Sequence, residues 1–90
     1  MLSLISPADV QQRLAKALRE QRQAQRLSRR ALAQRSAVPE PTIKRFETTG
    51  EISLRQFLIL WSCLDDLQRL DDLTRPSARG PKSIDEVLSS

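Results

Sequence analysis

Pro39 and Pro41 lie two residues apart in the stretch SAVPEPTIKRF, which covers residues 36–46. A proline fixes its own φ angle and has no backbone N–H, so it is tolerated in the first turn of a helix but not in its interior. The residues that follow read as helix, and Glu40 between the prolines suits the positive end of a helix dipole. The pair therefore predicts that a helix begins here, directly after a tight turn at 36–38.

Four further helices are predicted from apolar residues at helical spacing. Ser6, Ser28 and Ser53 precede three of them and suit the N-cap position. The expected limits of the four helices are about 7–26, 28–35, 54–64 and 65–73. Val10, Leu14, Ala17 and Leu18 make the apolar stripe of the first helix.

The composition favours helices and leaves little material for several classes of site. Leu, Ala, Gln and Arg dominate the 90 residues, which predicts one all-α domain with a modest core. The chain has no histidine and a single cysteine, Cys63, which excludes an internal disulfide and suits a reducing compartment. It has no apolar run of membrane-spanning length and no recognisable signal peptide. We expect a cytoplasmic protein that is not an enzyme, uses no cofactor or metal, and does not bind a membrane.

Charge divides the chain into a basic and an acidic part. Residues 1–50 contain ten Lys and Arg against four Asp and Glu, a net charge of +6. Residues 51–73 contain two against five, a net charge of −3. This asymmetry indicates a nucleic-acid face at one end and a different partner surface at the other. The alternative is that arginine-rich helix faces only keep the protein in solution.

A helix-turn-helix motif is predicted between residues 28 and 47. Its first helix is the short segment 28–35, and its second, at about 39–47, is the candidate recognition helix. Arginine bonds guanine through two atoms and lysine does so less directionally, whereas hydroxyls and helix N-termini suit phosphates. The candidate DNA-binding residues are Ser28, Arg29, Arg30, Glu40, Pro41, Thr42, Lys44 and Arg45. The alternative is that they are solvated faces of a plain helical bundle.

The stretch LSRRALAQRSAVPEPTIKRFETTGEISLRQFLILWSCLD resembles the five-helix, repressor-type domain shared by lambda-like phage repressors and the xenobiotic-response-element family. The matching positions are Leu27-Ser28, Leu32-Ala33, Ser36-Ala37-Val38, Thr42-Ile43, Phe46-Glu47, Gly50 and Leu54. The leading SPADVQQRLAKALREQR also resembles the start of HipB-like antitoxins. That resemblance implies a dimer that binds operator DNA, represses its own operon and holds a HipA-type serine/threonine kinase toxin.

The resemblance also implies roles for single residues. It gives Arg29 and Thr42 phosphate-facing positions and makes Lys44 and Arg45 the main groove contacts. The two prolines stand where glutamines often touch bases, which moves base readout towards Lys44 and Arg45. Glu40 either accepts a hydrogen bond from a cytosine amine or only completes the helix dipole. Glu47 is expected to tether the recognition helix, and the expected core includes Leu32, Ile43, Phe46 and Leu54.

The segment 54–64 is apolar on nearly every side, so it needs a cover. Either the fifth helix buries this surface within one subunit, or a second subunit does. A homodimer is favoured, because one recognition helix reads only a few base pairs and useful affinity needs two half-sites. The predicted dimerisation residues are Ile59, Leu60, Trp61, Cys63, Leu67 and Leu70.

Residues 74–90 are predicted to be a flexible linker and C-terminal tail, separate from the DNA-binding and dimerisation domain at 7–73. The segment 74–82, TRPSARGPK, is rich in proline and charge. In the final SIDEVLSS, Ile84, Val87 and Leu88 have the spacing of one helical face. We expect them to dock on a partner protein, above all a HipA-type kinase. The alternative is a disordered, solubilising end.

These observations give one functional hypothesis and two alternatives. The hypothesis is a sequence-specific transcriptional repressor that is the HipB-like antitoxin of a toxin–antitoxin operon. One alternative is a stand-alone repressor of phage or plasmid type. The other is a protein-interaction adaptor that has no DNA binding.

Overall fold

The computed structural model describes residues 4–76, and every regular element within that range is a helix. The elements are α1 (Pro7–Ala24), α2 (Arg29–Ser36), α3 (Glu40–Thr49), α4 (Leu54–Leu64), α5 (Gln68–Asp71) and the 3₁₀ turn η1 (Asp72–Thr74). The predicted all-α, five-helix fold is confirmed. The expected partner-binding residues Ile84, Val87 and Leu88, and most of the predicted tail, lie outside the described residues.

The three predicted serine caps are confirmed. The Ser6 hydroxyl accepts from the Asp9 N–H at 3.1 Å, and the Asp9 carboxylate accepts from the Ser6 N–H at 3.0 Å, which completes a capping box. Ser28 accepts from the Ala31 N–H and Ser53 from the Gln56 N–H. Each cap satisfies a backbone donor that the helix itself leaves unpaired, so the helix starts are set by local sequence.

The turn between α2 and α3 is tight and involves three residues. Ala37 adopts a left-handed conformation with φ 63°, and its N–H donates to the Ala33 carbonyl. The Ser36 hydroxyl accepts from the Val38 N–H at 3.1 Å, and the Val38 side chain is buried in the core. Pro39 is the N-cap of α3 and Pro41 lies in its first turn. The helix therefore starts one residue later than predicted, because Pro39 stands just outside it.

Gly50 ends α3 in a left-handed conformation with φ 80°. A Cβ atom at this position would lie 3.2 Å from the Cβ of Gln11, so any other residue would be both strained and crowded. Two side chains of α1 bond the end of α3: Gln11 donates to the Gly50 carbonyl and Gln12 to the Thr49 carbonyl. With these contacts α3 extends to Thr49, beyond its predicted end near Glu47.

One apolar core lies between α1, α2, α3 and α4. Its buried residues are Ala15, Leu18, Leu32, Val38, Ile43, Phe46, Phe57, Leu60, Trp61 and Leu64. The three aromatic rings are packed in series, with Phe57 5.6 Å from Phe46 and 5.7 Å from Trp61 between centroids. The expectation that Leu54 belongs to the core is wrong. Leu54 is the first residue of α4 and is 73% exposed, because the stripe of that helix turns inward only from Phe57.

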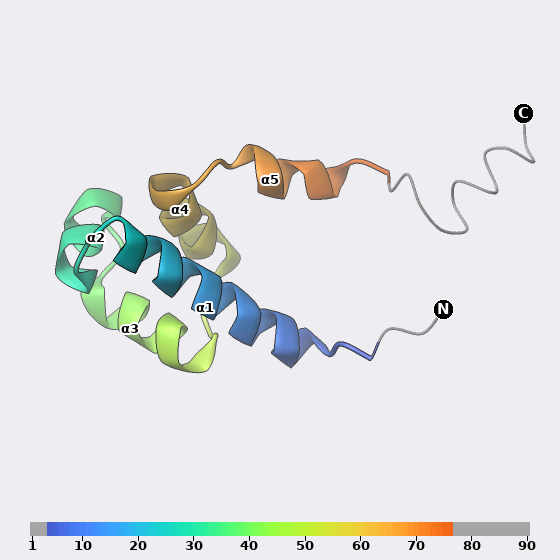
Figure 1. Cartoon of the computed structure of the whole chain (residues 1–90), viewed down its shortest axis with the longest axis horizontal. Coiled ribbons are helices and arrows are strands. Elements are labelled where there is room, and N and C mark those ends of the chain that lie inside the picture. Colours follow the sequence, from blue (N-terminus) through green and yellow to red (C-terminus); the bar gives the residue numbers. More distant parts are fainter. Residues whose placement is uncertain (1–3, 77–90) are drawn as a thin grey trace, which may run out of the picture.

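The helices are arranged with two distinct ends (Figure 1). α2 and α3 lie side by side at one end of the molecule, and α5 leaves the bundle towards the opposite end, on the side where α1 begins. The predicted fifth helix at 65–73 is shorter in the structure, where Asp65 and Asp66 form a corner before α5. No helix within residues 4–76 is long and apolar enough to cross a membrane.

Candidate nucleic-acid interface

α3 has a buried side and an exposed side. Ile43, Phe46 and Glu47 are buried, and they recur at the three- and four-residue spacing of one helical face. The opposite side is exposed and carries Glu40, Pro41, Lys44, Arg45 and Thr48. The helix is thus fixed along one face and free along the other, as the sequence predicts for a recognition helix.

The predicted DNA-binding residues divide into two groups by position. Ser28, Arg29 and Arg30 stand at the start of α2, and the remaining five stand along α3. Six of the eight are exposed, whereas Arg29 and Thr42 are half-buried. Because α2 and α3 pack on each other and are joined by the tight turn, both groups lie on neighbouring helices. Whether these residues contact DNA stays a prediction.

Arg45 has an acidic neighbour that the sequence argument did not anticipate. Its guanidinium lies 3.4 Å from the Glu51 carboxylate, and both side chains are largely exposed. Lys44, in contrast, has no ion pair among residues 4–76. A polar hollow of about 520 Å³ adjoins the Arg45–Glu51 pair and is lined by Gln11, Thr42, Arg45, Glu51, Ile52 and Gln56. The sequence signal was Glu51 directly after Gly50, where the chain turns back beside α3.

Glu47 is the centre of a buried ionic cluster. Its carboxylate accepts two hydrogen bonds from Arg22, from Nε at 2.7 Å and from Nη2 at 2.9 Å. It accepts a third from Arg29 Nε at 2.9 Å. Arg22 also donates to the Leu27 carbonyl at 2.7 Å, which fixes the loop between α1 and α2. The predicted tethering role of Glu47 is therefore supported by contacts to both preceding helices.

The pKa of Glu47 lies below its ordinary value. Burial alone would raise it, because burial disfavours the charged form. The hydrogen bonds from Arg22 and Arg29 and the charges of both guanidinium groups together outweigh that effect. Glu47 is accordingly ionised in the fold, and no buried side-chain nitrogen or oxygen within the described residues lacks a hydrogen-bond partner.

Arg22 is a buried residue that the sequence did not predict, since the predicted apolar stripe of the first helix included only Val10, Leu14, Ala17 and Leu18. It lies four residues after Leu18 and seven after Ala15, so it continues the same buried face of α1. The signal available in the sequence was an arginine at the spacing of the buried face of α1, together with a glutamate that was expected to tether α3. The structure joins the two residues as an ion pair that leaves only 9% of the Arg22 side chain and 1% of the Glu47 side chain exposed.

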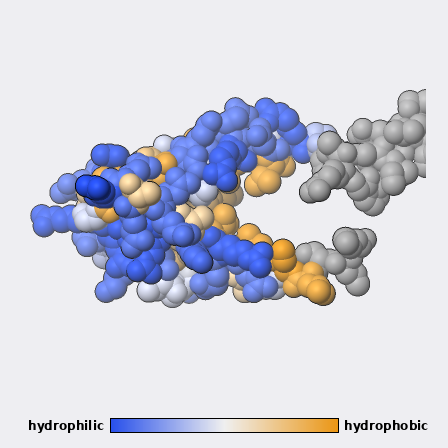
Figure 2. Space-filling model, in the orientation of Figure 1, coloured by the Kyte–Doolittle hydropathy of each residue, from blue (hydrophilic) through white to orange (hydrophobic). Residues whose placement is uncertain are grey.

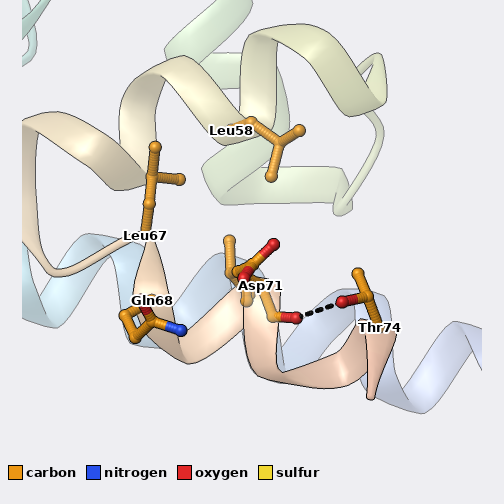
Figure 3. Close-up of a pocket in the computed structure, with 6 residues that line it drawn as sticks. Leu58, Leu67, Gln68, Asp71 and Thr74 are labelled. Atoms are coloured by element: carbon orange, nitrogen blue, oxygen red, sulfur yellow. Dashed lines mark hydrogen bonds between the residues drawn. The ribbon is translucent and has the colours of Figure 1, made fainter.

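A second surface of different character lies between α4 and α5. Figure 3 shows Leu58 of α4 facing Leu67 across an apolar groove, with Gln68, Asp71 and Thr74 along its edge. The groove has a volume of about 450 Å³, and Leu70 completes its lining. Figure 2 shows apolar residues on the inner side of the opening between α5 and the first part of α1, whereas the end formed by α2 and α3 is mainly hydrophilic.

The predicted dimerisation residues are only partly available on this surface. Leu60 and Trp61 are buried in the core of the subunit, so the expectation that they offer surplus apolar surface is wrong. They face inward because they continue the stripe that starts at Phe57. Ile59, Cys63 and Leu70 are half-buried against the core, and Leu67 is 44% exposed. The short α5 therefore covers α4 incompletely.

Polar contacts fix the corner from which α5 projects. The Asp65 carboxylate accepts from Gln21 of α1 and from Arg69 of α5, and the Arg69 guanidinium lies 5.4 Å from the centre of the Trp61 ring. Gln25 donates to the Leu64 carbonyl at 2.8 Å. A hydrogen bond from the Asp66 N–H, followed by that from Gln21, lowers the pKa of Asp65, which helps to keep this corner ionised. The direction of α5 is thus set at its base.

Comparisons of the chain with family models, with curated proteins and with solved structures found no match. The part of the chain that the structure describes also holds no group of three or more His, Cys, Asp or Glu side chains arranged to bind a metal.

Proposed function

We propose that this protein is a sequence-specific repressor that binds double-stranded DNA through α3. The observation that carries the proposal is the two-sided character of α3. One side is held by the core and by the buried carboxylate of Glu47, and the other presents Lys44 and Arg45 to solvent. Reading base edges in the major groove requires a rigid helix with exposed side chains of this kind.

In this proposal the two groups of basic residues have different tasks. Lys44 and Arg45 read bases from the exposed side of α3, while Arg29 and Arg30 contact phosphates from the start of α2. Arg45 exchanges Glu51 for a base on binding. That exchange costs little, because an exposed ion pair contributes only about 0–1 kcal/mol.

The proposed repressor is a homodimer joined through the groove between α4 and α5. The groove exposes Leu67 beside the half-buried Leu58 and Leu70. From this groove α5 runs away from α2 and α3 (Figure 1). A two-fold contact there would leave both α3 helices free to meet successive turns of one duplex face.

Selection from a pool of random duplexes tests this proposal. The full-length chain should enrich a two-fold symmetric site whose half-sites are about 10–10.5 base pairs apart, or a multiple of that spacing. The enriched duplex should bind more tightly than an unselected one at the same salt concentration. If no duplex is enriched and no duplex binds, the adaptor alternative replaces the repressor.

The finer proposal is that the repressor is a HipB-like antitoxin that also holds a HipA-type kinase. Its support is the resemblance of the residues around α1 and the helix-turn-helix, together with the apolar residues near the C-terminus of the sequence. Truncation after Arg75 tests it in co-expression with a kinase encoded beside the gene. DNA binding should survive, whereas affinity for the kinase should fall at least about tenfold, or 1.4 kcal/mol. Equal affinity of both forms would argue for a stand-alone repressor or a different docking surface.

A further inference from the structure

The Arg29 side chain is partly buried and partly exposed to solvent. Its Nε–H donates to the buried Glu47 carboxylate at 2.9 Å, yet 28% of its side chain is exposed. Its two Nη groups have no partner among residues 4–76, and no buried side-chain nitrogen in that range lacks one. Both Nη groups are therefore accessible to solvent, while the inner nitrogen is held.

The charges of the cluster do not cancel. Glu47 supplies one negative charge against the two positive charges of Arg22 and Arg29. Arg22 is buried and has all of its contacts inside the protein, with Glu47 and the Leu27 carbonyl. The remaining positive charge is therefore presented to solvent at Arg29.

Arg29 also lies where a helix normally favours an acid. It is the first residue of α2, and the first turn of that helix contains no acidic residue. The first turns of α1 and α3 contain Asp9 and Glu40, whereas the first turn of α4, like that of α2, contains no acidic residue. Because the N-terminal end of a helix carries a partial positive charge, Arg29 and Arg30 at this end are locally unfavourable, and an external anion would be favourable.

We propose that Glu47 is a positioning residue for phosphate recognition: it holds Arg29 by Nε so that both Nη groups face a DNA phosphate beside the start of α2. The inference rests on the proposed DNA-binding function and names a residue that acts through another one. An arginine that is already held loses less side-chain freedom when it binds a phosphate. Its planar guanidinium bonds an internal carboxylate and an external anion at once, which the single ammonium nitrogen of lysine does less well.

Two charge-conserving variants of the full chain test this assignment. Arg29→Lys keeps the charge but removes the separate Nε and Nη donors, and Arg35→Lys is the matched control because Arg35 is exposed in the last turn of the same helix and has no ion pair among residues 4–76. Their affinity is measured by fluorescence anisotropy on a mixed-sequence duplex of about two helical turns, at equal folded fraction by circular dichroism. We expect a loss of about fivefold or more for Arg29→Lys and of less than about twofold for Arg35→Lys. Equal, small losses would overturn the inference while leaving the proposed function intact. No binding by the wild type would remove the proposed function itself, and the inference with it.

A double-mutant cycle then separates positioning from folding. Glu47→Gln should weaken binding to the same duplex in the wild-type background, and this effect should disappear in the Arg29→Lys background if Glu47 acts through Arg29. A Glu47→Gln effect of the same size in both backgrounds would overturn the positioning role. If Glu47→Gln does not fold, the comparison of Arg29→Lys with Arg35→Lys decides alone.

Discussion

Two regions of the molecule, the end formed by α2 and α3 and the groove between α4 and α5, use charge and apolar surface in opposite ways. At the end formed by α2 and α3, a carboxylate and a guanidinium are buried and fully paired, and the exposed side chains are polar or basic. In the region between α4 and α5, apolar side chains are half-exposed around a groove. Of the carboxylates in this region, Asp66, Asp71 and Asp72 are exposed, whereas Asp65 is half-buried and paired with Arg69.

The end formed by α2 and α3 satisfies its buried groups within one subunit, whereas the groove between α4 and α5 leaves apolar surface uncovered. A buried ion pair tolerates only one geometry, because each charge needs its partners to compensate for lost hydration. The cluster around Glu47 therefore fixes α1, α2 and α3 relative to one another before any ligand arrives. An exposed apolar groove has no such requirement within the subunit, and in our proposal a second copy of the chain covers it.

The largest expected effect is the loss of the buried carboxylate. Glu47→Gln leaves Arg22 without a counter-charge in the core, so we expect the free energy of unfolding to fall by about 3–5 kcal/mol in urea denaturation. Glu51→Gln is the control, since it breaks an exposed pair and should change stability by less than about 1 kcal/mol. Similar values for both variants would mean that the cluster does not organise this end of the molecule.

The next effect concerns the groove between α4 and α5 and tests whether it is an interface. The double variant Leu67→Asp, Leu70→Asp places two carboxylates in the groove, where a second subunit would have to bury them. We expect dimer dissociation to increase at least about a hundredfold, or about 2.8 kcal/mol, by sedimentation velocity over a concentration series. The helical circular dichroism signal should persist, because neither residue belongs to the buried core. If the wild type is dimeric and this variant sediments like it, the interface lies elsewhere.

The comparison also explains how much of the fold could be predicted from the sequence. Serine caps, the proline pair and Gly50 act over three or four residues, so the starts and ends of α1–α4 were predicted to within a few positions. The prediction that Leu54 belongs to the core was wrong, because apolar spacing does not tell which end of an apolar stripe reaches the core. The fifth helix was predicted too long, because the corner at Asp65 depends on a contact with Gln21, 44 residues away, that no local pattern encodes.

The candidate site was predictable in its outline but not in its connections. Exposed residues of α3 follow from helical period, and the tether at Glu47 followed from the family resemblance. The partners of Glu47 could not be predicted, since Arg22 and Glu47 are 25 residues apart and nothing local indicates that they meet. For the same reason, helical spacing could not show that Leu60 and Trp61 are already buried within one subunit.

A smaller effect is expected on the polar side of the α2–α3 end. Arg45→Ala should weaken binding to the selected duplex by about 1–3 kcal/mol and relax the base preference at one position. Arg30→Ala should weaken all duplexes alike and flatten the salt dependence of binding, because a phosphate contact carries no sequence information. Anisotropy titrations on selected and unselected duplexes at several salt concentrations distinguish the two patterns. If both variants lose specificity equally, the division between base-reading and phosphate-binding residues does not hold.

The smallest expected effect is the response of the Glu47 cluster to acid. The pKa of Glu47 is lower in the folded protein than in the unfolded chain, so its stabilisation is fully present above the ordinary glutamate pKa of 4.5. It is lost as the pH falls from that value through the lower folded-state pKa. One such group changes the free energy of unfolding by at most about 1.4 kcal/mol per pH unit.

Urea denaturation of the wild type between about pH 6 and 3 should therefore show a steeper decline than that of Glu47→Gln, which has no titrating group at this site. Asp9 and Asp65 also have lowered pKa values and remain in both proteins, so their contributions cancel in the difference. Parallel declines would show that the buried carboxylate is no better stabilised in the fold than in the unfolded chain, and the contrast between the two regions of the molecule would lose its physical basis.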